Sequence, residues 1–265
     1  AAMEGQLKAL WIMGEDVVQT EPNSAHVKTA LEQLDLLVVQ ELFYSETARY
    51  ADVILPASSF FEKEGTFTSG ERRVQRVNRV VKPLKGTKPD GVIVTELMNR
   101  MGYPQPPYHP DTLLNEIAGV VPFFKGIQWI RLGNNGLQWP VAADGTDTQI
   151  LHTETFEFGK GRMQFIDFAE SKELEKYALQ FPYILTTNHS LEHYNSGSMT
   201  RRTQDRQLLK EDLLMVNPRD AKEKGISDGD RIRIRSARGS TEIVVQITDI
   251  VNPGVVSTTF HFPEI

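Results

Sequence analysis

Residues 10–55 carry the sequence pattern that decides the fold class. They contain three short apolar runs, Leu10-Trp-Ile-Met13, Leu36-Leu-Val-Val39 and Ala51-Asp-Val-Ile-Leu55. Between the first two runs, apolar residues recur at the spacing of one buried helical face, at Val27, Leu31 and Leu34. Strand, helix and strand in this order, with continuously apolar strands, are typical of a parallel sheet that helices cover on both faces. The first part of the chain is therefore predicted to be α/β.

The pattern changes further along the chain. A helix is predicted to be capped by Asp90 and to end at Gly102, and a proline-rich connector follows before a short helix at residues 111–119. Beyond residue 150 apolar residues alternate with a period of two, which predicts a hairpin over residues 155–166 and strands over residues 231–235 and 241–247. The last part is therefore predicted to be mainly β, either a barrel or a sandwich.

The composition excludes several classes of protein. The chain has 265 residues, 29 Lys+Arg against 35 Asp+Glu, a formal net charge of −6, and no cysteine. Without cysteine these residues form no disulfide, thiolate zinc site or iron-sulfur ligation. The mild acidity argues against a nucleic-acid or membrane-surface binder, and the longest apolar stretch, Ile117 to Phe124, is too short to span a bilayer. Since the start of the chain has no secretion signal, a cytoplasmic location is predicted.

Positive charge is concentrated in a predicted hairpin near residues 62–82 and just beyond it. The cations are Lys63, Arg72, Arg73, Arg76, Arg79, Lys82, Lys85 and Lys88. Gly65 and Gly70 have the spacing of a phosphate-binding loop, but Glu71-Arg72 stands where that loop requires Lys followed by Ser or Thr, so a β-turn is predicted. The basic run is interpreted either as a solvated hairpin face or as a site for phosphates or an acidic partner surface.

A second motif matches the H-x-x-E-H order of zinc hydrolases, at His189, Glu192 and His193. That chemistry needs a helix, which places the two histidines one turn apart. The strand-like segment before the motif and Asn195-Ser-Gly197 after it disfavour such a helix. A polar or ligand-facing turn is the favoured interpretation, and a zinc hydrolase remains an alternative.

Two acidic side chains, Asp16 and Glu41, follow successive apolar strands. Because the carboxyl ends of parallel strands meet at one edge of a sheet, we expect these carboxylates to lie where such folds bind ligands. A carboxylate accepts from both the ring N–H and the amino group of guanine, whereas adenine offers no such pair of donors. Helix N-termini after Ser24 and Asp90 are suited to phosphates. Capping and solvation explain single carboxylates equally well, so these features alone favour a guanine nucleotide only weakly.

Six segments form an ordered set across nearly the whole chain. They are Ile12-Met-Gly-Glu-Asp16, Val38-Val-Gln-Glu41, Ala51-Asp-Val-Ile-Leu-Pro56, Glu62-Lys-Glu-Gly-Thr-Phe-Thr-Ser-Gly-Glu-Arg-Arg-Val-Gln75, Gly136-Leu-Gln-Trp-Pro140 and Glu192-His-Tyr-Asn-Ser-Gly-Ser-Met-Thr-Arg-Arg202. Together they resemble the C-terminal part of the molybdopterin oxidoreductase family, particularly the catalytic (alpha) subunits of formate dehydrogenases. Members of this family hold molybdenum or tungsten between two molybdopterin guanine dinucleotides.

The resemblance implies a division of the chain into three ranges. Residues 1–125 are expected to form an α/β dinucleotide-binding region, residues 126–170 a connector with the hairpin, and residues 171–265 a double-psi β barrel truncated at its C-terminus. The chain is then a fragment, and a 4Fe-4S cluster is bound by an absent N-terminal part. The segment from Lys63 to Arg79 is expected to lie near that cluster.

The resemblance assigns no catalytic residue and no metal ligand to this chain. It assigns cofactor binding to Asp16, Gln40, Glu41, Lys63, Asp90, Thr187, Asn188, His193, Tyr194, Ser196 and Phe260. Lys63 matches a lysine close to a pterin, and the segment from Thr187 to Ser196 matches a loop that wraps the cofactors. Gly91 departs from the tryptophan that follows this aspartate in the family, which leaves less packing against the base.

The resemblance also implies an activity and partners. The intact subunit is expected to oxidise formate to carbon dioxide and to pass electrons to subunits that carry iron-sulfur clusters or flavin, while this chain alone is inactive. Its nearest partner is the N-terminal remainder of the same subunit, with no nucleic acid and no membrane contact. Two alternatives stay open besides the zinc hydrolase: the same part of a nitrate reductase or other molybdopterin oxidoreductase, and a stand-alone binding module.

Overall fold

The computed structural model describes residues 1–169 and 171–262. The chain forms two compact units: unit 1 contains residues 1–39, 43–52 and 165–265, and unit 2 contains residues 40–42 and 53–164. The ranges 1–125, 126–170 and 171–265 inferred from the sequence divide the chain differently and stay predictions. Residue 170 and residues 263–265, at the ends of two of those ranges, lie outside the described residues.

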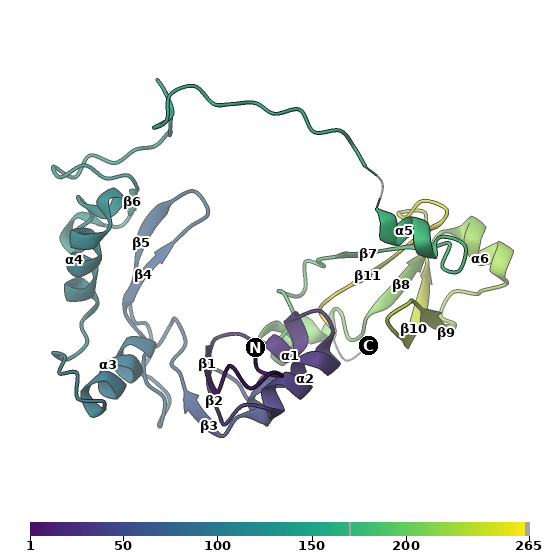
Figure 1. The fold of residues 1–265 in the computed structure, drawn as a ribbon, viewed down its shortest axis with the longest axis horizontal. Coiled ribbons are helices and arrows are strands. Elements are labelled where there is room, and N and C mark those ends of the chain that lie inside the picture. Colours follow the sequence, from purple (N-terminus) through teal and green to yellow (C-terminus); the bar gives the residue numbers. More distant parts are fainter. Residues whose placement is uncertain (170, 263–265) are drawn as a thin grey trace. The chain divides into compact units, whose positions relative to one another are not determined.

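The α/β pattern predicted for the start of the chain is confirmed. β1 (Ala9–Met13), β2 (Leu36–Glu41) and β3 (Val53–Pro56) form a sheet in this order, with α1 (Val17–Thr20), α2 (Ser24–Glu32) and the 3-10 helix η1 (Thr47–Tyr50) in the connections (Figure 1). The side chain of Asn23 caps α2 by accepting from the N–H of His26. Leu31 of this helix packs against strand residues Ile12, Leu37 and Val39, so the helical stripe and the strands bury one another.

Unit 2 is built on the predicted basic hairpin. β4 (Gly65–Thr68) and β5 (Arg73–Val77) are antiparallel, and β6 (Leu137–Gln138) pairs with β5 (Figure 1). The two predicted helices are present as α3 (Asp90–Arg100) and α4 (Pro110–Val120), followed by the 3-10 helices η2 (Pro122–Phe124) and η3 (Trp129–Arg131). The core of this unit consists of Val74, Leu114, Ile127, Leu132 and Val141.

Several cations of the basic run hold this unit together. Arg72 donates to the carbonyl oxygens of Thr148 at 3.1 Å and Gln149 at 2.9 Å, and also to that of Trp139. The guanidinium of Arg76 lies 4.5 Å from the ring centroid of Trp129. The basic run is therefore partly a structural clamp that fixes residues 129–149 on the hairpin, rather than only a solvated face or a partner surface.

The last part of the chain is the predicted mainly β region. Its strands are β7 (Ile184–Asn188), β8 (Leu213–Val216), β9 (Arg231–Arg235), β10 (Ser240–Ile247) and β11 (Val255–Thr259). They form a sheet in the order β7-β11-β8-β10-β9 (Figure 1), with β11–β7 and β10–β8 parallel and β11–β8 and β10–β9 antiparallel. Short helices accompany this sheet: α5 (Lys172–Tyr177), η4 (Thr200–Arg202), η5 (Gln204–Gln207) and α6 (Pro218–Lys224). Across residues 1–169 and 171–262, no helix has both the length and the apolarity needed to cross a bilayer.

The structure differs from the sequence predictions at two places. The predicted hairpin over residues 155–166 is a single bridge between Phe156 and Gly159, and its apolar side chains stay exposed, Phe158 and Met163 at 98% each. Alternation favours a strand only where a sheet is available to cover one face. The second difference is Asp90, which does not cap α3: the N-cap is Pro89, and the Asp90 carboxylate binds other side chains.

Substitution of Gly136 tests how closely the chain before β6 approaches the hairpin. The φ of Gly136 is +70°, and a Cβ there would lie 2.4 Å from the carbonyl oxygen of Val74, whereas Gly133, with φ +52°, faces open space. Gly136→Ala is therefore expected to lower the free energy of unfolding by roughly 3 kcal/mol, and Gly133→Ala by about 1 kcal/mol from backbone strain alone. Urea unfolding of both variants checks this, and equal losses would contradict the close approach.

Candidate functional site

Three of the predicted site residues, Gln40, Lys63 and Asp90, meet in unit 2. Gln40 Nε2 donates to Asp90 Oδ1 at 2.7 Å, and Lys63 Nζ forms an ion pair with Asp90 Oδ2. They come from the end of β2, from the segment before β4 and from the first turn of α3. Gln40 Oε1 is buried and has no hydrogen-bond partner within the described part of the chain. Buried polar atoms in native proteins nearly always have one, so this oxygen indicates a partner outside the chain, such as water or a ligand.

A cavity of about 250 Å³ lies beside these residues. Its lining contains three charged residues, Lys63, Glu64 and Asp90, and the rest of the lining includes Tyr108, Pro110, Leu113, Leu114 and Ile117. This volume is below the roughly 300–1,000 Å³ that complete small-molecule sites occupy. The cavity therefore fits one ring system of a larger ligand.

The protonation states of this pocket follow from its geometry. Burial raises the pKa of Asp90, but hydrogen bonds from Lys63 and Gln40 and the charge of Lys63 outweigh that effect and hold the pKa below its usual range. Burial, and then the charge of Asp90, raise the pKa of Tyr108. At neutral pH the pocket therefore presents an ionised carboxylate and a phenol that keeps its proton.

Asp16 lies in unit 1, where it is 5% exposed and organises the loop after β2. Its Oδ1 accepts from the N–H of Thr47 at 2.9 Å and from the Thr47 hydroxyl at 2.6 Å, while Oδ2 accepts from the Glu46 N–H and the Gln19 side chain. Both oxygens thus serve the protein itself. The predicted contact of Asp16 with guanine, and its proximity to Glu41, stay predictions; Glu41 accepts from the N–H of Leu42.

His193 lies in a loop, so the H-x-x-E-H motif lacks the helix that a zinc hydrolase needs. Its Nε2 is 2.9 Å from the carbonyl oxygen of Leu209 and its Nδ1 is 3.2 Å from the hydroxyl of Thr200, so both ring nitrogens are engaged inside the protein. Within residues 1–169 and 171–262, no group of three potential metal ligands comes together. His193 acts here as a positioning residue for the loop.

His261 fixes the same loop, although no sequence pattern pointed to it. It is fully buried, its Nε2 accepts from the N–H of Ser190 at 2.9 Å, and its Nδ1 bonds the carbonyl oxygen of Asn195. The neighbouring Phe260 ring meets the His189 ring edge-on, with centroids 4.4 Å apart. Ser190 and His261 are 71 residues apart, so no local spacing could have revealed the pair.

The remaining predicted residues of this loop differ in exposure. Ser196 is buried, and its Oγ lies 3.0 Å from Ser198 Oγ, whereas Thr187, Asn188 and Tyr194 are exposed. Asn188 nevertheless donates to the buried Ser257 at 3.1 Å. Arg202 donates to the carbonyl oxygen of Tyr44 at 3.1 Å. Tyr44 precedes the residues that Asp16 holds, so this contact joins the two groups of predicted residues in unit 1.

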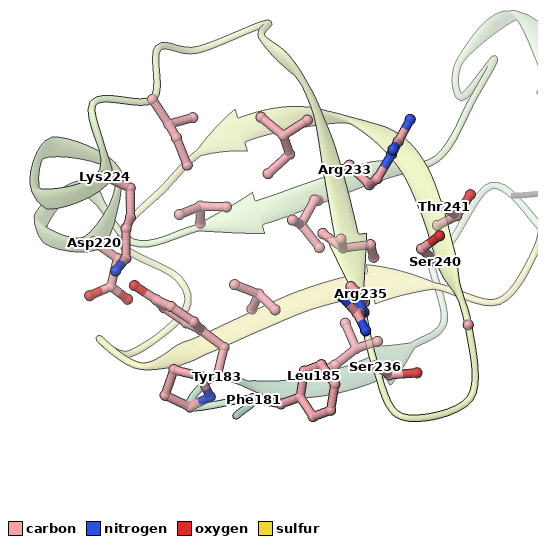
Figure 2. Close-up of a pocket in the computed structure, with 18 of the residues that line it drawn as sticks. Phe181, Tyr183, Leu185, Asp220, Lys224, Arg233, Arg235, Ser236, Ser240 and Thr241 are labelled. Atoms are coloured by element: carbon pink, nitrogen blue, oxygen red, sulfur yellow. The ribbon is translucent and has the colours of Figure 1, made fainter. Parts of the chain in front are cut away.

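A larger cavity of about 720 Å³ lies on an apolar face of the five-stranded sheet (Figure 2). In this view Tyr183, Asp220 and Lys224 lie toward one side of it, and Arg235 and Ser236 lie toward the other. None of the predicted site residues is among the described residues that line it. Of the described groups whose pKa is shifted, two, Asp90 and Tyr108, line the smaller pocket and none lines this larger cavity, which favours the smaller pocket as the functional one of the two.

Comparison with known families gives matches to the first and the last part of the chain. Residues 1–100 match the molybdopterin oxidoreductase model, and residues 183–265 match the model described as "Molydopterin dinucleotide binding domain". The chain belongs to the molybdopterin oxidoreductase family. The resemblance inferred from the six sequence segments is confirmed.

Several proteins similar to this chain carry formate dehydrogenase names. The chain is 38% identical to the F420-dependent formate dehydrogenase subunit alpha of Methanocaldococcus jannaschii, over 97% of this chain and 39% of that protein. It is 40% identical to the F420-dependent formate dehydrogenase 2 subunit alpha of Methanococcus maripaludis, over 98% of this chain and 39% of that protein. The chain thus spans about 39% of the length of these relatives. Acetylene hydratase from Pelobacter acetylenicus shares the fold, with a TM-score of 0.72 and 19% identity over 97% of this chain and 38% of its own.

Asp90 links the stability of unit 2 to pH. Folding favours its ionised form, because its pKa lies below the unfolded value of 3.8, so its contribution is present above that value and is lost as the pH falls through the lower folded pKa. Asp90→Asn is expected to cost about 1 kcal/mol or less at pH 7, since solvent screens this half-exposed ion pair, and to remove this part of the acid dependence. Thermal unfolding measured from pH 7 to pH 2 checks this. If the unfolding temperature depends on pH in the same way in variant and parent, Asp90 is not a source of the acid dependence.

His261 is expected to control the order of the loop after β7. In His261→Phe the N–H of Ser190 and the carbonyl oxygen of Asn195 lose their partner, which costs roughly 1–3 kcal/mol locally. Hydrogen exchange of the Ser190 amide should then be at least tenfold faster than in the parent. Leu191→Ala, at a fully exposed side chain of the same loop, is the matched control and should leave that exchange rate unchanged; equal acceleration in both variants would refute the role of His261.

Proposed function

We propose that this chain is the cofactor-holding part of a formate dehydrogenase catalytic subunit. In this proposal it binds the molybdopterin guanine dinucleotides of a molybdenum or tungsten centre, and the intact subunit oxidises formate to carbon dioxide. The observation that carries the proposal is the convergence of Gln40 and Lys63 on Asp90, beside a pocket that Lys63 and Asp90 line, in a chain of the molybdopterin oxidoreductase family.

The residues of the pocket fit such a group. Guanine and pterin share an edge with a ring N–H, an amino group and a carbonyl oxygen. A carboxylate such as Asp90 accepts from the first two, and an ammonium group such as Lys63 donates to the third. Gln40 Oε1, a buried oxygen beside Asp90 without a partner among the described residues, adds further capacity for a hydrogen bond. Once bound, the metal centre supplies the two-electron redox chemistry, while these residues bind and orient the group.

The predicted residues of unit 1 divide into two roles under this proposal. Thr187, Tyr194 and Phe260 present exposed or half-exposed side chains and contact the cofactor directly. Asp16 and His193 have their polar atoms engaged within the protein, so they act by positioning the loops that make the contacts. The five-stranded sheet with its crossed parallel and antiparallel pairs supports a partial double-psi barrel.

The choice of formate rests on the names of the relatives. Formate gives up two electrons and one proton to become carbon dioxide, so the electrons need an exit, which we assign to a 4Fe-4S cluster outside this chain and to partner subunits with iron-sulfur clusters or flavin. A cytoplasmic location is part of the same proposal. The 265 residues alone are proposed to be inactive, because they supply binding groups and no ligand to the metal.

The test uses the polypeptide as its host produces it, captured by an antibody against this chain. The expected result is molybdopterin with bound guanine nucleotide, molybdenum or tungsten by elemental analysis, and formate-dependent reduction of an artificial electron acceptor. The 265-residue chain produced alone is the control and should show no such reduction. Captured polypeptide without any molybdopterin would overturn the proposal, and molybdopterin without formate oxidation would overturn the choice of substrate.

A further inference from the structure

The pocket beside Asp90 has an aromatic residue in its wall that no sequence pattern assigned. Tyr108 lies in the proline-rich connector before α4, and its ring rests directly on Gly91 in the first turn of α3. A Cβ added at position 91 would lie 2.1 Å from ring carbon Cε2 of Tyr108. The Tyr108 ring therefore occupies the space that any side chain at position 91 would need.

The backbone gives no reason for glycine at this position. Gly91 is helical, not left-handed, and glycine destabilises a helix relative to alanine. What distinguishes this helix position is the contact with Tyr108. Gly91 and Tyr108 thus form a coupled pair, in which the missing side chain of one allows the ring of the other to line the pocket.

The ring of Tyr108 lies among groups that suit a planar polar ligand. Lys63 and Asp90 line the same cavity, and each Asp90 oxygen that accepts from Gln40 or Lys63 keeps a second lone pair for a ligand donor. Because the phenol stays protonated, it adds no negative charge beside Asp90. Aromatic side chains bind heterocyclic rings by stacking or edge contact, which adds to the affinity that hydrogen bonds provide.

We propose that Tyr108 is a binding residue for the ring system held by Asp90 and Lys63, and that Gly91 exists to make room for it. The ligand is a fused heterocycle with a 2-amino-4-oxo edge, the part that guanine and pterin have in common. This inference rests on the proposed function and adds to it the residue that contacts the ring.

The test measures how much cofactor the host-produced polypeptide retains after gel filtration. The readout is molybdopterin, as its fluorescent oxidised derivative, per folded polypeptide, with the folded fraction taken from the amplitude of the unfolding transition. Tyr108→Leu is expected to retain about tenfold less, and Gly91→Ala a similarly reduced amount because its Cβ displaces the ring. Tyr108→Phe should stay within about twofold of the parent. Tyr103→Leu, an exposed tyrosine on the same connector, is the matched control and should retain the parental amount.

The outcomes separate this inference from the proposed function. If the parent contains molybdopterin and both Tyr108→Leu and Gly91→Ala retain it fully, the role of Tyr108 is wrong and the proposed function stands. If the parent contains none, both are wrong. Loss in Tyr108→Leu that is matched in Tyr103→Leu would also count against Tyr108, since it would reflect the connector and not the ring.

A second measurement identifies the ring. Cofactor-free polypeptide is titrated with guanosine diphosphate and with 6-hydroxymethylpterin, for the parent and for Tyr108→Leu. Weaker binding of the nucleotide alone assigns the pocket to guanine, and weaker binding of the pterin alone assigns it to the pterin. Weaker binding of both supports recognition of the shared edge. If neither affinity depends on Tyr108, the proposed ring contact is refuted.

Discussion

A carboxylate that is partly removed from water has to be paired, and Asp90 meets this constraint with two side chains from other segments. Lys63 and Gln40 bring the segment before the hairpin and the end of β2 to the first turn of α3. The ion pair and hydrogen bond offset the desolvation of the carboxylate, which is why its pKa stays low. The charged groups of the pocket are therefore in place before any ligand arrives, and ordering them adds little to the cost of binding.

Asp16 and Asp90 show how surroundings separate the roles of one residue type. Both stand next to a helix start, and the resemblance assigned both to cofactor binding, Asp90 with less packing against the base because Gly91 follows it. Asp16 accepts hydrogen bonds from the N–H groups of residues 46 and 47 and from the hydroxyl of Thr47, so its oxygens are occupied by contacts within the protein. Asp90 has fewer internal donors and borders a cavity. Availability of lone pairs, and not the presence of a carboxylate, distinguishes a binding group from a structural one.

Local periodicity predicted the elements whose burial it reflects directly, such as α2, β2, β9 and β10. It failed for residues 155–166, where alternating Phe158 and Met163 have no sheet to cover them, because a strand needs neighbours that the local sequence does not specify. The roles of His261 and Arg72 also could not be predicted from the sequence. Their partners are 71 and up to 77 residues away, and only the folded chain brings such groups together.

Gly91 and Tyr108 show that a residue role inferred from relatives depends on which side chains surround the residue in the folded chain. Position 91 departs from the tryptophan expected after the aspartate, and taken alone that departure weakens the assignment of Asp90. In space the gap is filled, because the ring of Tyr108 lies where a side chain at position 91 would begin. A binding carboxylate can be flanked by an aromatic ring from any segment of the chain that places the ring beside it. A site residue is therefore better judged by what occupies its surroundings than by identity at a single aligned position.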